Sequence, residues 1–237
     1  MRFEILRDPV WNNIRVDEPT LQLVDTEVFQ RLRYVRQLGW TYLVYPGATH
    51  SRFEHALGTH HLSRRTLALL CEAEDATSID EDEQAIVRSA ALLHDVGKIA
   101  VPESILSKPG PLSDTERELV ERHSLIGFEL LRDLGLSPVD TYVLHHHEQW
   151  AGTGYPYGLA GAEIPFGSRL IHVADAFHAL TSDRAYRRAV SIEAAMHELH
   201  GESGRQFDPL VVSALHDHLA HPATTIRRNE LQPAWSS

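Results

Sequence analysis

Residues 85–98 read AIVRSAALLHDVGK, and this stretch decides how the fold is interpreted. Its leucine and alanine residues are typical of a buried helix, which Gly97 would end. His94 and Asp95 stand where that helix ends, so an imidazole and a carboxylate would emerge together. Burial of both groups costs free energy unless something binds them. An isolated His-Asp pair is more commonly a hydrogen-bonded pair at the end of a core helix, so its meaning depends on the rest of the chain.

The composition excludes several classes of protein. The chain has 237 residues, 43% of them hydrophobic, which is enough for a buried core. Its formal net charge of −11 argues against binding to a nucleic-acid polymer, which requires a basic face. The single cysteine, Cys71, rules out an internal disulfide framework and suits a reducing compartment. Since no apolar run is long enough to span a membrane and MRFEILRDPV lacks the apolar core of a secretory signal, we expect a cytoplasmic protein.

Helical periodicity dominates the chain and indicates an all-α fold. Residues 2–16 alternate loosely around an Asn-Asn pair, which predicts a short β-hairpin or an extended arm. From Thr20 the apolar spacing predicts one helix that ends before Gly39. Ser113 and Glu116 form a capping-box signature at the start of a later helix. Further helices are predicted over residues 53–73, 82–95, 114–134, 138–149, 165–181, 191–200 and 208–219.

The domain organisation is expected to be simple. No repeat or low-complexity tract is present, and glycine and proline clusters lie between the periodic segments rather than in a long linker. We therefore expect a single domain over residues 1–221, in which residues 1–48 form an N-terminal arm and the first helix. Residues 222–237 lack periodicity and predict a flexible tail.

Several of the 16 histidines stand where helices could direct them to one point, together with two aspartates. Imidazole and carboxylate ligands without cysteine suit Fe, Mn or Zn in a hydrolytic or oxygen-handling site, and one aspartate can bridge two metal ions. Seven such ligands are too many for one ion and suit two. The seven are His55, His94, Asp95, His123, His146, His147 and Asp175.

Three motifs resemble the HD-GYP branch of the HD superfamily, metal-dependent phosphodiesterases of cyclic di-GMP. The motifs are HDVGK, HHE followed by GTGYP, and GLAGAEIPFGSRLIHVADAFHALTSDRAYRRA, within a resemblance from about Ala85 to about residue 215. The N-terminal part, with DPVWNNIRV and FQRLRYVRQLGWTYLVYPGATHSRFEHALGTHHL, is similar instead to the deoxynucleoside triphosphate triphosphohydrolases. Both resemblances imply an all-helical HD fold, but they imply different substrates. The resemblance to HD-GYP proteins implies in addition a dinuclear metal site.

The resemblance assigns roles to the metal ligands. The ligands of the metal common to the superfamily would be His55, His94, Asp95 and Asp175. Asp95 would bridge to a second metal, completed by the ligands His123, His146 and His147. Some HD-GYP proteins hold a third metal through a glutamate at the position of Ser51, so two divalent ions are expected here. Fe or Mn is expected first, with Zn, Ni, Co and Mg as alternatives.

The resemblance also assigns residues to the substrate. Lys98, Arg184 and Arg187 occupy positions expected to hold the phosphates or bases of a ligand. Gly152 and Gly154 would permit the turn that presents Tyr155 beside the metals.

Other positions depart from the family or compete for the ligand role. Ala151 and His178 stand where the family usually has aspartate, which bears on the geometry of the substrate loop more than on metal binding. His172 and His178 flank Asp175 at three-residue spacing, and we expect both to hydrogen-bond to its carboxylate rather than to bind metal. His60, His61 and His145 are expected to be solvated or to support the ligands.

The expected reaction is hydrolysis of a phosphoester or phosphoanhydride, in which two cations share Asp95 and lower the pKa of a bridging water. Lys98 would neutralise charge on the phosphoryl oxygens. The leading substrate is cyclic di-GMP or another cyclic dinucleotide. The alternative is a nucleoside phosphate, supported by Gln37, Leu38 and Arg52, with residues 42–49 packed over the site.

Two further alternatives are a di-iron oxygenase and a degenerate nucleotide receptor. The complete ligand set counts against the receptor, and Lys98 favours phosphate chemistry over oxygenation. The expected partner is thus a small phosphorylated nucleotide, and the sequence leaves a homo-oligomer open.

Overall fold

A computed structural model of the chain describes residues 3–8, 11–35, 51–72, 79–108, 110–182 and 189–220. These ranges are mostly helical, and their strands form one short antiparallel hairpin, which confirms the predicted fold class. No helix within them is both long and apolar enough to cross a lipid bilayer. The predicted tail, residues 222–237, lies outside these ranges, and the domain limits of 1–221 remain a prediction.

The described elements are one hairpin followed by helices. The hairpin pairs β1 (Phe3–Asp8) with β2 (Asn12–Asp17). The helices are α1 (Glu18–Val24), α2 (Glu27–Arg31), α3 (Arg52–Glu72), α4 (Glu81–Leu93), the 3-10 helix η2 (Val96–Ala100), α5 (Glu103–Leu106), α6 (Asp114–Glu121), α7 (His123–Asp133), α8 (Val139–Leu144), the 3-10 helix η3 (Gly161–Glu163), α9 (Phe166–Thr181), α10 (Ile192–Gly201) and α11 (Pro209–Ala220).

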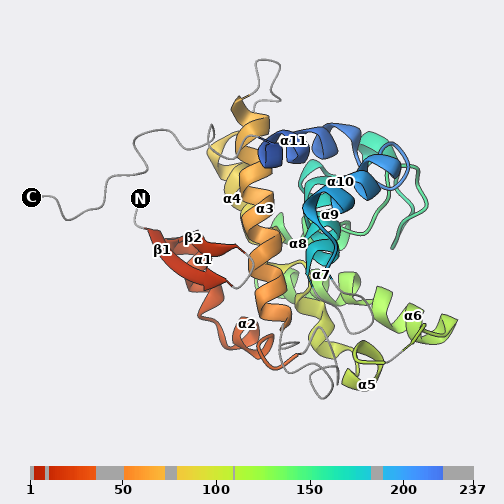
Figure 1. The fold of residues 1–237 in the computed structure, drawn as a ribbon. Helices are drawn as coiled ribbons and strands as arrows, with labels where there is room; N and C mark the ends of the chain where they lie inside the picture. The colour runs from red at the N-terminus through yellow and green to blue at the C-terminus, as the bar shows by residue number, and fades with distance from the viewer. Residues whose placement is uncertain are drawn as a thin grey trace, which may run out of the picture.

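Helix α3 is the central element and runs through the middle of Figure 1. It packs against α4, α9, α11 and the hairpin. One apolar cluster joins α3 to β2, α4 and α7, with Leu57 and Leu92 among its buried residues. A second joins α3 to α9, α10 and α11, around Phe177 and Leu215. The two clusters therefore join the helices around the candidate ligands: α3, α7 and α9 carry His55, His123 and Asp175, and His94 directly follows α4.

The N-terminal hairpin is confirmed, but the predicted turn is wrong. Asn12 and Asn13 lie inside β2, where Asn12 pairs with Asp8 and Asn13 with Arg7. Strand β1 ends at Asp8 and β2 begins at Asn12, so the asparagines are not the turn. The alternation of apolar side chains continues through the asparagines, with Ile14 and Val16 buried, and this burial outweighs their turn preference.

The single helix predicted after Thr20 is also wrong, because two short helices occupy its first part. Helix α1 ends at Val24, and Thr26 caps α2 by accepting a hydrogen bond from the amide of Phe29 at 3.3 Å. A threonine cap satisfies an amide that has no partner within its helix, so a new helix begins inside a continuous apolar pattern. Residues 36–50, which include the predicted end of the helix, lie outside the described residues.

Two other predicted helices are shorter than expected. The segment 114–134 divides at Arg122 into α6 and α7, so that His123 opens α7, and the capping box of Ser113 and Glu116 is present. The segment 138–149 ends as a helix at Leu144. The three histidines of the HHHE stretch therefore follow α8 rather than belonging to it.

Gly97 permits the closest approach between the His-Asp segment and the ligand-bearing helix α7. A Cβ atom at this position would lie 2.0 Å from the carbonyl oxygen of His123 and 2.7 Å from the amide nitrogen of Gly127. Both neighbours are backbone atoms, so neither can rotate away. The absence of a side chain at Gly97 thus sets the spacing between Asp95 and His123.

We predict that Gly97→Ala lowers the free energy of unfolding by about 1–3 kcal/mol, because overpacking forces η2 and α7 apart. The control is Gly201→Ala at the end of α10, where an added Cβ has no neighbour within 4 Å. That variant should be neutral or slightly stabilising. Urea unfolding of both variants measures the difference, and equal stabilities would contradict the packing role of Gly97.

Candidate metal centre

Three buried histidines of the site are anchored in the same way. Each points its Nδ1 atom at the carbonyl oxygen of the residue three positions earlier. The N···O distances are 2.8 Å for His94 and Ala91, 2.6 Å for His123 and Val120, and 2.6 Å for His146 and Val143. Because a carbonyl oxygen only accepts, each Nδ1 must carry the proton and donate it. Each Nε2 is therefore left with a lone pair, the form required of a metal ligand.

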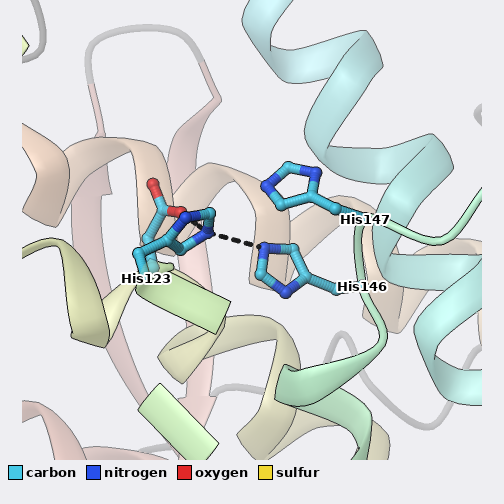
Figure 2. A group of neighbouring side chains, drawn as sticks. His123, His146 and His147 are labelled. Carbon is cyan, nitrogen blue, oxygen red and sulfur yellow. Dashed lines mark hydrogen bonds and ion pairs between the residues drawn. The ribbon is translucent and has the colours of Figure 1, made fainter. Parts of the chain in front are cut away.

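The lone pairs of two of these rings face each other. Nε2 of His123 lies 3.3 Å from Nε2 of His146, as the dashed line in Figure 2 shows. With both protons on Nδ1, neither atom can donate to the other, and a cation is the natural partner of both. Nε2 of His94 has no hydrogen-bond partner within the described residues and lies 3.7 Å from Asp95 Oδ1. These donor atoms therefore fit a metal ion.

The candidate ligands form two groups that share Asp95. One group consists of Asp95, His123, His146 and His147, and the other of His55, His94 and Asp95. Within each group the potential ligand atoms lie within 4.8 Å of one another. Asp175 adjoins the second group, since its Oδ1 lies 2.8 Å from Nε2 of His55 and 4.0 Å from Nε2 of His94. The structure thus brings together all seven residues predicted as ligands.

Two cationic side chains contact the shared carboxylate. Lys98 Nζ lies 2.7 Å from Asp95 Oδ1 and 2.9 Å from Oδ2, and Arg52 Nη1 lies 2.9 Å from Oδ2. Burial by itself would raise the pKa of Asp95, but the charge of Lys98, assisted by His94 and Arg52, holds it well below the usual range. Burial lowers the pKa of Lys98, and Asp95 opposes that change. Asp95 is therefore ionised, and two of the cationic residues predicted to bind substrate, Lys98 and Arg52, lie at the site.

Burial lowers the pKa values of four imidazoles of the site and so keeps these four neutral at physiological pH. Burial lowers the pKa of His55 to about 4 and that of His123 to about 3. Burial, followed by the influence of neighbouring histidines, lowers the pKa values of His146 and His147 well below their usual range. Neutral imidazoles are the form that binds metal, so the protein itself prepares these ligands.

Glu148, which follows the three histidines, holds the loop of the GTGYP motif. Its carboxylate is buried and accepts hydrogen bonds from the backbone amides of Tyr157 at 2.9 Å and Leu159 at 3.0 Å. Glu148 belongs to neither group of candidate ligands. Sequence reasoning missed this role, and the signal that could have shown it is the glutamate placed between the ligand pair and the turn.

The turn itself depends on two glycines for different reasons. Gly152 has a φ of +79°, which favours glycine. At Gly154 a Cβ atom would lie 2.4 Å from the carbonyl oxygen of His147, so the loop packs directly on the histidine segment. The ring of Tyr155 consequently lies beside that of His147, with centroids 4.8 Å apart. Burial raises the pKa of Tyr155, so its phenol keeps the proton.

His178 contacts a candidate ligand, but not the one predicted. Its Nδ1 lies 2.9 Å from Nδ1 of His55, whereas the sequence predicted a bond to the carboxylate of Asp175. If His55 binds a cation through Nε2, its proton is on Nδ1 and His178 accepts it. The other nitrogen of His178 faces Ser182 Oγ at 3.5 Å. Gly58 makes this arrangement possible, since a Cβ there would lie 2.0 Å from His178 Nε2.

Three further histidines near the candidate ligands make other contacts. Buried His60 donates from Nδ1 to the carbonyl oxygen of Arg88 at 3.0 Å, so it is not solvated. His145 lies 3.6 Å from Glu148 Oε1. The prediction for His172 also needs correction, because it packs on Phe207 with ring centroids 5.1 Å apart and faces Gln206 rather than the carboxylate of Asp175.

Some predicted residues cannot be placed. Gln37, Leu38, Arg184, Arg187 and the segment 42–49 lie outside the described residues. Ala151 is placed, and its backbone amide donates to the carbonyl oxygen of Arg205 at 2.8 Å.

Comparison with known families decides the relationship of this chain. A family model described as the HD domain matches residues 51–211, which include every candidate ligand. The chain belongs to the HD domain family. The expected resemblance to this superfamily is therefore confirmed, and the two ligand groups belong to an HD domain.

Characterised relatives of this HD domain are larger proteins. RpfG of Xanthomonas campestris, named a cyclic di-GMP phosphodiesterase response regulator, is 44% identical over 140 residues, which cover 58% of this chain and 37% of RpfG. A cyclic di-GMP phosphodiesterase of Thermotoga maritima is 38% identical over 160 residues, covering 66% and 43%. The 3′3′-cGAMP-specific phosphodiesterase 2 of Vibrio cholerae is 37% identical over 163 residues, covering 67% and 31%. The chain thus spans less than half the length of each.

Solved structures support the fold of the HD domain. Bd1817, described as an HDG"Y"P protein from Bdellovibrio bacteriovorus, matches with a TM-score of 0.56 at 21% identity, over 70% of this chain and 52% of its own. The cyclic GMP-AMP-specific phosphodiesterase V-cGAP3 of V. cholerae matches with a TM-score of 0.54 at 22% identity, over 71% and 44%. At this level of identity the likeness concerns the fold alone.

We predict that Glu148→Gln lowers the free energy of unfolding by about 1.5–3 kcal/mol. The side-chain NH2 group of glutamine would face one of the two backbone amides, so that two donors meet where a hydrogen bond had been. Metal content should be unchanged, since Glu148 is outside both ligand groups. Urea unfolding and metal analysis give the two readouts, with exposed Glu129→Gln as the control. Loss of metal at unchanged stability would instead identify Glu148 as a ligand.

We predict that His178→Leu weakens metal binding about 10–100-fold, because His55 loses the acceptor that orients its ring. His178→Asn keeps an oxygen near the position of Nδ1 and should retain most of the affinity. Competition of the purified proteins with a chelator for Mn²⁺ measures both affinities. Equal metal affinities of the Leu and Asn variants would show that His178 does not position the ring of His55.

Proposed function

We propose that this HD domain is a metal-dependent phosphodiesterase that hydrolyses a cyclic dinucleotide. The observation that carries the proposal is the pair of ligand groups sharing Asp95, with imidazole lone pairs of His123 and His146 directed at one point. The identities of 37–44% to proteins named as cyclic dinucleotide phosphodiesterases support the substrate class.

The residues present would hold two divalent ions. The first would be bound by His55, His94, Asp95 and Asp175, and the second by Asp95, His123, His146 and His147. When bound, such ions lower the pKa of a water molecule and stabilise negative charge on phosphoryl oxygens. We propose Fe or Mn, because a site of imidazoles and carboxylates without thiolates suits these ions. The proposal includes a cytoplasmic location, in keeping with the single cysteine, Cys71.

The cationic side chains of the site would hold the phosphate. Lys98 and Arg52 each lie 2.9 Å from Asp95 Oδ2, so both reach the point where the ligand groups meet. In a site this buried, their charges would stabilise the additional negative charge that develops during attack at phosphorus. The protonated phenol of Tyr155 stands beside His147 and can donate a hydrogen bond to the same phosphate.

The proposed reaction adds one water across one P–O ester bond. The oxygen of water bonds to phosphorus, the ester oxygen leaves and takes up a proton, and a linear dinucleotide with a terminal phosphate results. No covalent intermediate with the protein is required, and Cys71 lies in neither ligand group.

A nucleoside phosphate remains the alternative substrate because of Arg52. Its guanidinium contacts the shared carboxylate and could hold the phosphates of a single nucleotide. Cleavage of deoxynucleoside triphosphates, with none of cyclic di-GMP or linear pGpG, would favour this alternative and overturn the proposal.

We predict that Asp95→Asn lowers kcat for cyclic di-GMP by about a thousandfold or more, because the bridging charge is lost while the shape is kept. Metal content should fall in the same variant. Product analysis by chromatography and metal analysis test this, with exposed Asp133→Asn as the control. Near-full turnover of Asp95→Asn at saturating Mn²⁺ would show that the chemistry lies elsewhere.

A further inference from the structure

A cleft of about 430 Å³ adjoins the metal centre and carries groups that the proposed reaction does not use. His147 and Asp175 line it, so it opens directly on both ligand groups. Ala179 and Leu180 of α9 and Phe207 supply apolar surface. A cleft lined by two candidate ligands and apolar side chains suits the part of a substrate that lies next to its reacting phosphate.

The wall formed by α10 and the segment after it is acidic. Glu198 and Glu202 both line the cleft. Arg205 neutralises Glu202, since its Nε donates to Oε2 at 2.9 Å and its Nη2 pairs with Oε1. The carboxylate of Glu198 makes no hydrogen bond or ion pair with any residue that the structure describes. One carboxylate thus remains available to a ligand, and its charge repels phosphate from this wall.

A nucleobase suits both the apolar surface of the cleft and its unpaired carboxylate. Its faces are flat and apolar enough to pack on Phe207 and Leu180, and its edge carries hydrogen-bonding groups. Guanine presents two adjacent donors, N1–H and the N2 amino group, which match the two oxygens of a carboxylate. Adenine presents an acceptor at N1, which a carboxylate repels. An unpaired carboxylate in such a cleft would therefore favour guanine over adenine.

We propose that the cleft binds one guanine base of the substrate and that Glu198 recognises the N1–H and N2 edge of that base. The inference rests on the proposed function, because it places the base next to a phosphate held at the metal centre. Pockets for small ligands range from about 300 to 1,000 Å³. A cleft near the lower limit suits one nucleoside, so the second half of a cyclic dinucleotide lies outside it. The class of substrate is thus a cyclic dinucleotide with at least one guanine.

Glu198→Gln tests the inference, because the amide keeps the size of the side chain but offers only one acceptor. With metal-loaded protein we expect KM for cyclic di-GMP and 3′3′-cGAMP to rise about 10–100-fold. KM for cyclic di-AMP should not rise, and kcat and metal content should remain as in the wild type. An interaction that is equally strong in the ground state and in the transition state changes KM and leaves kcat unchanged. Glu193→Gln, on the same helix but outside the cleft, controls for the loss of charge.

An unchanged ratio of KM between cyclic di-GMP and cyclic di-AMP in Glu198→Gln would overturn the inference. If the wild type cleaves none of the three, the proposed function fails, and equilibrium binding of GMP and AMP then decides the inference. Preference for GMP in the wild type that is lost in Glu198→Gln supports it, and equal binding of the two nucleotides overturns it.

Ala179→Phe fills the cleft without changing charge and should weaken the binding of GMP. Binding of GMP at wild-type strength would count against the cleft as the site.

Discussion

A single ionised carboxylate, that of Asp95, is completely buried at the end of an apolar helix, and its neighbours compensate for its charge. An ionised group without partners in such a place costs several kcal/mol. Here it has the ammonium group of Lys98, the guanidinium group of Arg52 and imidazoles from α4, α7 and the segment after α8. These groups together offset the free energy of burying the charge of Asp95, and none of them acts independently of Asp95.

Backbone contacts give the centre its rigidity. The rings of His94, His123 and His146 are oriented by carbonyl oxygens of their own segments, so their donor atoms are directed before any ligand binds. Two glycines allow the chain to approach these segments closely: Gly97 brings η2 against α7, and Gly154 brings the loop of Tyr155 against His147. Preorganisation of this kind reduces the free energy that binding must spend on ordering.

The sequence was informative about the ligands because motifs with fixed spacing carry them. His94 and Asp95 could be placed at a helix end, and the motif positions assigned the remaining ligands. Local competition was harder to predict: the cap supplied by Thr26 interrupts an apolar pattern that favoured one helix, and burial of Ile14 outweighs an asparagine turn. Such outcomes depend on small differences in free energy, which the spacing of apolar residues does not reveal.

Roles that depend on tertiary neighbours could not be predicted at all. Glu148 acts through the amides of Tyr157 and Leu159, and His178 acts through His55 on a different helix. In the second case sequence reasoning chose the nearer partner, Asp175, because residues three apart on a helix share a face. The space beside Gly58 decides otherwise, and only the packing of α9 on α3 reveals that space.

The contact between His55 and His178 joins positions 123 residues apart in the sequence. Between them lie the other candidate ligands, so the centre is complete only after α3, α4, α7 and α9 have all docked. Contacts of such long range form against a large loss of chain entropy and dominate the time that a domain takes to fold. No fragment that begins after His55 or ends before Asp175 can contain the full ligand set. A complete metal centre would consequently form late in the folding of this chain.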